Sequence, residues 1–209
     1  MSGVVLTFRQ VMARNVQIEK RKELAAKAMD VLRVEGLECS MTALAEALGL
    51  KRPTLLYYFP DKASIVELAL ETTLAEQVQF TVGEMAKHRH PVDRLYAQVR
   101  SVHAFHKGRE ERIIFLIQAL ATAGKERTDQ ILRIGNQAFE MHRIALAAEI
   151  KYAIAQGTMH PCDPQALIQL VRSVVDGVLV QRVMTDCDFE PIHEFLWNHV
   201  LGPLKVEQT

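Results

Sequence analysis

The sequence predicts an all-α protein of about nine helices, in which a small N-terminal module precedes a larger helical domain. Three observations support this fold class. Apolar residues recur at spacings of three and four along most of the 209 residues, which is the period of a helix packed on one side. Glycine and proline interrupt the pattern at intervals that suit short connections. No run of alternating β-branched residues stands between turn signals, so no sheet is expected.

Composition narrows the class of protein further. Hydrophobic residues make up 49% of the chain, which is enough for a sizeable core, and the formal net charge is zero. The three cysteines, Cys39, Cys162 and Cys187, are widely separated and odd in number, which argues against a disulfide framework. No apolar run approaches the ~18 residues that span a bilayer, and the short patch Val4–Leu6 is not a signal peptide. We therefore expect a cytoplasmic protein with no membrane partner.

The start of the chain is expected to hold an arm followed by a helix. Residues Met1–Val16 are interpreted as a flexible or partly helical arm, in which Arg9 and Arg14 either reach a DNA minor groove or have no role. A helix over Ile18–Glu35 follows, because its apolar residues share one face and Gly36 is a suitable C-terminal stop.

The segment Ser40–Lys62 organises the N-terminal module and has the pattern of two short helices joined by a tight turn. Ser40 is a good N-cap, since its hydroxyl can accept a hydrogen bond from an unpaired backbone N–H. Gly49 can end the first helix in a left-handed conformation, and Pro53 suits the first turn of the second. Asp61 is expected to cap the next helix. This is the helix-turn-helix pattern, whose second helix lies in the DNA major groove.

Polar residues on the second helix separate two interpretations of this segment. An ordinary αα-hairpin inside a helical core has no use for a row of donors, whereas a DNA reader needs them. The first 62 residues contain ten basic and seven acidic residues, so they carry a net charge of +3 and the remainder carries −3. Arg52 is predicted to read a base, and most of the other polar residues to contact phosphates. The predicted DNA-binding residues are Ser40, Thr42, Lys51, Arg52, Pro53, Thr54, Leu56, Tyr57, Tyr58 and Lys62.

The same segment resembles the TetR family of bacterial transcriptional regulators. The resemblance rests on Ser40, Ala45, Gly49, Thr54, Leu55, Tyr57, Tyr58, Phe59 and Lys62. Two positions depart from the family pattern: Leu56 stands where the first tyrosine of the recognition helix is usual, and Lys51 where serine or threonine often follows the turn. The resemblance implies three DNA-binding helices, a long connecting helix, and a helical core that binds an effector and dimerises.

Capping residues, glycine and proline divide the rest of the chain into six further predicted helices. They cover Asp61–Lys87, Pro91–Lys107, Glu110–Ala123, Thr128–Gln156, Asp163–Met184 and Glu190–Leu201. Asp163 followed by Pro164 is a strong helix start. The predicted domains are 1–62, with the arm and the DNA-binding module, and 63–209, for ligand binding and dimerisation.

Aromatic, methionine and polar residues of the middle helices are candidates for an effector pocket. Taken singly they are more often plain core residues, but the family resemblance implies a pocket among these helices. The predicted set is Met85, His103, Phe105, Phe115, Gln118, Asn136, Phe139, Met141, His142 and Tyr152, which suits a mainly apolar ligand. His103 and His106 share a helix face and His142 could approach them, but no metal-ligand motif is present. No metal or cofactor is therefore expected.

The last two predicted helices have the features of a dimer interface. Ser173 and Gly177 are small residues four apart, which lets another helix approach closely, and the final helix adds apolar residues such as Phe195. Packing within one chain is the alternative. The family resemblance favours a homodimer through these helices.

The sequence as a whole indicates a homodimeric TetR-like repressor that leaves a palindromic operator in double-stranded DNA when a small molecule binds. No nucleophile elbow, phosphate-binding glycine loop or dinucleotide fingerprint is present, so the chain is not expected to be an enzyme. Two alternatives stay open: a helical small-molecule-binding protein without operator binding, and an enzyme on a helical scaffold. No motif identifies the effector, the operator sequence or the regulated genes.

Overall fold

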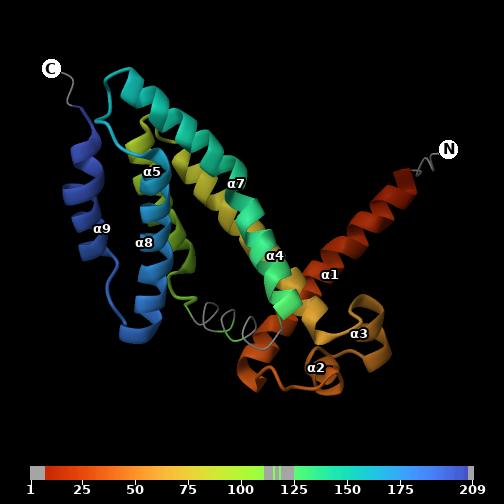
Figure 1. The fold of residues 1–209 in the computed structure, drawn as a ribbon. Coiled ribbons are helices and arrows are strands. Elements are labelled where there is room, and N and C mark those ends of the chain that lie inside the picture. The colour runs from red at the N-terminus through yellow and green to blue at the C-terminus, as the bar shows by residue number, and fades with distance from the viewer. Residues whose placement is uncertain (1–7, 111–114, 116–117, 119–124, 207–209) are drawn as a thin grey trace. The chain divides into compact units, whose positions relative to one another are not determined.

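The computed structural model describes residues 8–110, 115, 118 and 125–206, and over these residues the fold is all-α (Figure 1). The predicted fold class is confirmed. The chain divides into two compact units, residues 1–73 and residues 74–209. The division falls inside helix α4, Lys62–Met85, and so lies beyond the domain boundary at residue 62 that the sequence suggests. Among the described residues, no helix combines the length and apolarity needed to cross a membrane.

The first unit packs three helices and the start of α4 around a small core. These helices are α1 (Phe8–Glu35), α2 (Met41–Ala47) and α3 (Arg52–Tyr58). Side chains from all four helices and from the residue after α3 are fully buried together: Leu32, Leu44, Leu55, Phe59 and Ile65. The guanidinium carbon of Arg21 lies 5.2 Å from the centroid of the Phe59 ring, which covers this core with a cation–π contact.

Helix α1 begins earlier than predicted. It starts at Phe8, inside the segment Met1–Val16 that the sequence suggested as an arm. The reason is local, because no glycine or proline stands between Phe8 and Gly36 to stop the helix from extending toward the N-terminus. Gly36 ends the helix at φ 86°, as predicted.

The second unit contains the rest of α4 and a bundle of helices with one continuous core. The bundle consists of α5 (Pro91–His106), α7 (Lys125–Ala155), α8 (Pro164–Thr185) and α9 (Glu190–Leu196). Helix α5 packs most extensively along α8, and α7 packs on both of them (Figure 1). The side chain of Asp163 accepts from the backbone N–H groups of Gln165 and Ala166, which confirms the predicted cap of α8. The helix predicted over Glu110–Ala123 falls mostly outside the described residues.

The last helix ends differently from the prediction, which extended it to Leu201. Helix α9 stops at Leu196, and the chain continues as a π-helical turn, Trp197–Leu201, and a 3-10 turn, Gly202–Leu204. The N–H of Gly202 donates to the carbonyl of Trp197, five residues earlier. A Cβ on Gly202 would stand 2.7 Å from that oxygen, so glycine permits the wider turn where other residues would not.

Candidate functional site

The α2–turn–α3 segment has the geometry of a helix-turn-helix. Ser40 Oγ accepts from the N–H of Ala43 at 3.1 Å, and Gly49 adopts φ 67°, so both sequence predictions are confirmed. The N–H of Leu50 donates to the carbonyl of Ala45 at 2.8 Å and closes the turn. Asp61 Oδ1 accepts from the N–H of Ser64 at 2.8 Å and caps α4. The segment therefore holds α3 firmly while leaving one of its faces open.

The open face of α3 carries positive charge that no described residue neutralises. Lys51 and Arg52 are exposed, and neither side chain forms an ion pair or hydrogen bond within the described part of the chain. The lysines of α1 differ, because Lys20 and Lys27 both pair with Glu23, at 3.2 and 2.7 Å. Hydrogen bonds from Lys27 and Lys20 lower the pKa of the Glu23 carboxyl. The unpaired cations of the first unit thus include those at the start of α3, where a phosphate or base contact is predicted.

The other predicted DNA-binding residues lie mostly on the exposed side of the hairpin. Ser40, Thr42, Pro53, Thr54 and Tyr57 are exposed, and Leu56 and Tyr58 are half-buried. The hydroxyl of Tyr57 accepts from Gln17 Nε2 at 2.9 Å, a contact that the sequence did not indicate. This bond orients an aromatic side chain that is otherwise 71% exposed.

Lys62 has a structural contact in addition to its predicted role at DNA. Its ammonium donates to the carbonyl of Leu37 at 2.6 Å and so ties the first residue of α4 to the loop after α1. An ammonium has three donors, so two remain for a phosphate. The partner lies 25 residues away in sequence, which is why no local pattern could reveal it.

The predicted effector residues are spread over several environments of the second unit. Met85, His103 and Phe115 are buried, Phe105, Phe139 and His142 are half-buried, and Gln118, Asn136, Met141 and Tyr152 are exposed. The ring of Phe105 lies 6.0 Å from that of Phe80, and Asn136 Oδ1 accepts from Arg172 Nη2 at 3.0 Å. Of this set, Tyr152 lines the groove described next.

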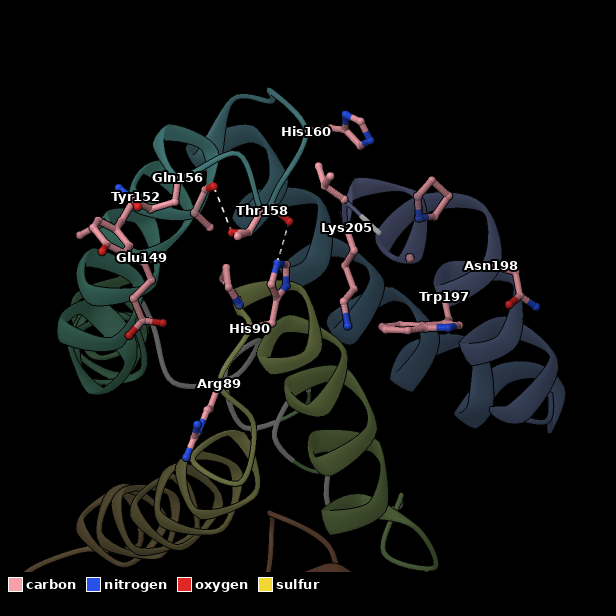
Figure 2. Close-up of a pocket in the computed structure, with 16 residues that line it drawn as sticks. Arg89, His90, Glu149, Tyr152, Gln156, Thr158, His160, Trp197, Asn198 and Lys205 are labelled. Carbon is pink, nitrogen blue, oxygen red and sulfur yellow. Dashed lines mark hydrogen bonds between the residues drawn. The ribbon is translucent and has the colours of Figure 1, made fainter. Parts of the chain in front are cut away.

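A groove of about 1450 Å³ lies at the end of the second unit where α5 begins and α7 ends (Figure 2). Its walls come from the α4–α5 connection, the last turns of α7, the α7–α8 loop and the C-terminal segment. Hydrogen bonds join these walls: His160 N–H donates to the Leu204 carbonyl at 2.8 Å, and Val206 N–H donates to the Thr158 carbonyl at 3.1 Å. The same Thr158 oxygen accepts from His90 Nε2 at 3.1 Å, while His90 Nδ1 accepts from the N–H of Val92.

Most charges along this groove are compensated within the chain. Both oxygens of Glu149 accept from Arg94 Nη1 at 2.5 Å. The ammonium of Lys205 lies 2.9 and 3.0 Å from the carboxylate oxygens of Asp93 and 5.7 Å from the ring centroid of Trp197. Arg89 lines the groove and is exposed, and its guanidinium pairs with no described residue.

A buried histidine pair joins α5, α8 and α9. His103 Nε2 lies 3.1 Å from the carbonyl of Val175, which can only accept, so this nitrogen carries the hydrogen. Neutral His103 then has a bare Nδ1, which accepts from His193 Nε2–H at 2.7 Å. His193 Nδ1 is left as a buried acceptor without a hydrogen-bond partner, 3.9 Å from Glu190 Oε2. One arrangement of neutral tautomers therefore accounts for both hydrogen bonds of His103.

Burial sets the protonation of this pair. Desolvation lowers the pKa of His103 from 6.5 to about 4 and also lowers the pKa of His193. Both rings are therefore neutral at pH 7. Since both nitrogens of His103 are bonded within the chain, the structure gives this residue a core role that the sequence did not predict. No cluster of three or more potential metal ligands occurs among the described residues.

Comparison with known proteins agrees with the geometry of the first unit. Residues 24–69 match the model of the tetR family of bacterial regulatory proteins. The resemblance seen in Ser40–Lys62 is thereby confirmed. No curated protein matches the chain by sequence.

Solved structures share the fold across most of the chain at low sequence identity. The transcriptional regulator FadR from Bacillus subtilis in complex with stearoyl-CoA is 16% identical, with a TM-score of 0.65 over 93% of this chain and 100% of that one. AibR, in complex with isovaleryl coenzyme A and operator DNA, is 17% identical, with a TM-score of 0.62 over 87% and 97%. The superantigen PfiT is 18% identical, with a TM-score of 0.65 over 90% and 97%. The fold is therefore shared with proteins that differ in function.

Proposed function

We propose that this chain, which carries the DNA-binding module of the tetR family at residues 24–69, is a homodimeric repressor released from a palindromic operator by a small molecule. The observation that carries the proposal is the exposed, unpaired cationic start of α3, held on a capped helix-turn-helix. In such a module the second helix enters the major groove, and its first residues reach base edges. Arg52 is our candidate for a base contact, because an arginine can donate two hydrogen bonds to guanine.

Selection of binding sites from a random DNA pool, followed by fluorescence anisotropy on the selected site, tests DNA binding. Arg52→Ala should weaken binding to the selected site by roughly 1–3 kcal/mol and relax sequence preference at one position of each half-site. Arg133→Ala is the matched control, since it removes an exposed arginine of α7. Equal losses on selected and random DNA would contradict base reading by Arg52.

The exposed face of α8 supports the dimer. Leu170, Val180 and Met184 on α8 and Phe195 on α9 are 38–72% exposed although they are apolar. A Cβ on Gly177 of α8 would have no described atom within 4 Å beyond its chain neighbours and the backbone of its own helix. Two copies related by a two-fold axis would bury these residues and place the half-sites of a palindrome about 34–36 Å apart.

Helix α4 provides the connection between ligand and DNA in this proposal. It is one continuous helix that begins in the first unit and ends in the second. A ligand that binds one orientation of α4 better than another would shift the population of operator-competent dimers. The effector region that we propose is the predicted set without Tyr152, which lines the groove, and without His103, whose two ring nitrogens are bonded within the core. It includes Phe105, Gln118 and Phe139.

The choice of first ligands to screen comes from the structural relatives. FadR holds stearoyl-CoA and AibR holds isovaleryl coenzyme A, so acyl thioesters of coenzyme A are reasonable first candidates here. A true effector must lower operator affinity, and by linkage the operator must lower effector affinity by the same factor. A chain that binds ligand but selects no DNA would instead be a helical small-molecule-binding protein, the alternative that the sequence left open.

A further inference from the structure

We propose that the groove at the end of the second unit binds a small organic anion that carries an aromatic ring. This site is separate from the interhelical effector region, although Tyr152 was predicted for that region. Binding at the groove does not depend on DNA binding, so the two proposals stand or fall separately.

The groove is preorganised, because hydrogen bonds and an ion pair connect the segments that form its walls. The C-terminal segment pairs with the α7–α8 loop through the Met159–Lys205 bridge. His90 links the start of α5 to Thr158 on that loop through its ring. Lys205 holds Asp93 of α5. These contacts fix the backbone around the groove, so a ligand would meet walls that need little rearrangement.

The charge left over after internal pairing is positive. Glu149 is neutralised by Arg94, and Lys205 by Asp93. Arg89 lines the groove from the α4–α5 connection, and its guanidinium has no partner within the described chain. Its side chain extends toward the end of α4 (Figure 2). A ligand that brings one negative charge to Arg89 would complete the pairing.

The groove also offers aromatic surface and amide groups. Tyr152 is 67% exposed on the α7 wall, and Trp197 is half-buried on the opposite wall (Figure 2). Large exposed aromatic side chains bind planar rings by offset stacking or edge contacts. Gln156 and Asn198 are exposed polar residues along the same groove and can orient a ligand by hydrogen bonds. Charge and ring surface together point to an aromatic anion rather than to a bare inorganic ion or a neutral lipid.

A pair of probes that differ in charge tests the proposal. 1-Anilinonaphthalene-8-sulfonate carries the aromatic body and one anion, and N-phenyl-1-naphthylamine has the same body without the sulfonate. Both are titrated into the full chain by fluorescence. Trp197 is the single tryptophan of the sequence, so one indole cross-peak in a ¹H–¹⁵N spectrum reports on the groove during each titration.

We expect the sulfonate probe to bind more tightly than the neutral probe and to shift the indole peak. Arg89→Gln should weaken the sulfonate probe about two- to fivefold, as for an exposed ion pair, and leave the neutral probe unchanged. Tyr152→Ala should weaken both probes about two- to tenfold. Arg133→Gln and Ile144→Ala, which alter an exposed arginine and an exposed apolar side chain outside the groove, should change neither.

Two results would overturn the proposal. One is sulfonate binding that Arg89→Gln and the Arg133→Gln control affect equally. The other is probe binding that leaves the Trp197 indole peak in place. Either result would leave the DNA-binding proposal intact, because operator affinity is measured on its own.

Discussion

The His103–His193 pair makes the stability of the protein depend on pH in a way that one substitution can isolate. The perturbation is His103→Gln, measured against the unchanged chain from pH 7.5 to pH 4.5. A glutamine amide can keep a donor for the Val175 carbonyl but does not titrate. The variant should therefore lose part of the acid sensitivity while keeping the fold.

The sign and size follow from the lowered pKa. The unfolded chain binds a proton on this histidine below the ordinary pKa of 6.5, whereas the folded chain binds one only near pH 4. The contribution of neutral His103 to the free energy of unfolding is therefore fully present above pH 6.5 and is lost as the pH falls toward 4. Between pH 7.5 and pH 5 the loss from His103 is about 2 kcal/mol. His193 contributes in the same direction, since its pKa is also lowered by burial.

Urea unfolding followed by Trp197 emission gives the free energy at each pH, with protein concentration held fixed because a dimer is expected. His103→Gln should be less stable at pH 7.5, yet lose about 2 kcal/mol less than the unchanged chain on going to pH 5. His160→Gln is the control, because it removes an exposed histidine. The reasoning fails if the unchanged chain, His103→Gln and the control lose stability equally.

Three further changes test other parts of the structure. Lys62→Ala removes the bond to Leu37 and should lower the free energy of unfolding in urea by about 1 kcal/mol. It should also weaken binding to all DNA sequences alike and make the salt dependence of binding flatter. An unchanged free energy of unfolding would show that the bond does not stabilise the fold. Gly177→Arg should give a folded monomer by light scattering and circular dichroism. A Cβ at this position meets no side chain or other helix within 4 Å in the described chain, whereas the added charge would be buried at the proposed two-fold interface; a soluble dimer would move the interface elsewhere. Gln118→Trp should abolish the response of operator binding to an identified effector while DNA binding without ligand persists; an unchanged response would place the effector region elsewhere.

Local sequence signals were enough for the elements of the DNA-binding module. The Ser40 cap, the left-handed Gly49 and the Asp61 cap were all predicted, because each depends on contacts within a few residues. Local signals also explain why the predicted start of α1 and the predicted end of α9 were wrong. No helix-stopping glycine or proline between Phe8 and Gly36 marks where α1 begins. The π-helical turn at Gly202 depends on a close approach to the Trp197 carbonyl, which the spacing of apolar residues does not reveal.

Function at the residue level was predictable only in part. The exposed cations at the start of α3 could be named from the motif. The structure was needed to find that no described residue pairs with them, and to find the bond between Gln17 and Tyr57. The predicted effector residues share helical spacing and apolar character, yet spacing does not say whether a side chain faces a cavity, a neighbour or solvent. Met141 and Tyr152, for example, have the predicted spacing but are largely exposed to solvent.

The sequence by itself determined the all-α class, the helix-turn-helix and the resemblance to the TetR family, because helical period, caps and turn residues act over short stretches of chain. Tertiary structure alone decided the histidine pair, whose members are 90 residues apart, and the groove, whose walls run from Arg89 to Val206. Such sites depend on which faces of distant helices meet. The same local pattern of apolar residues is compatible with several ways of packing the helices. Which helix faces meet is therefore decided by the packing of the whole core.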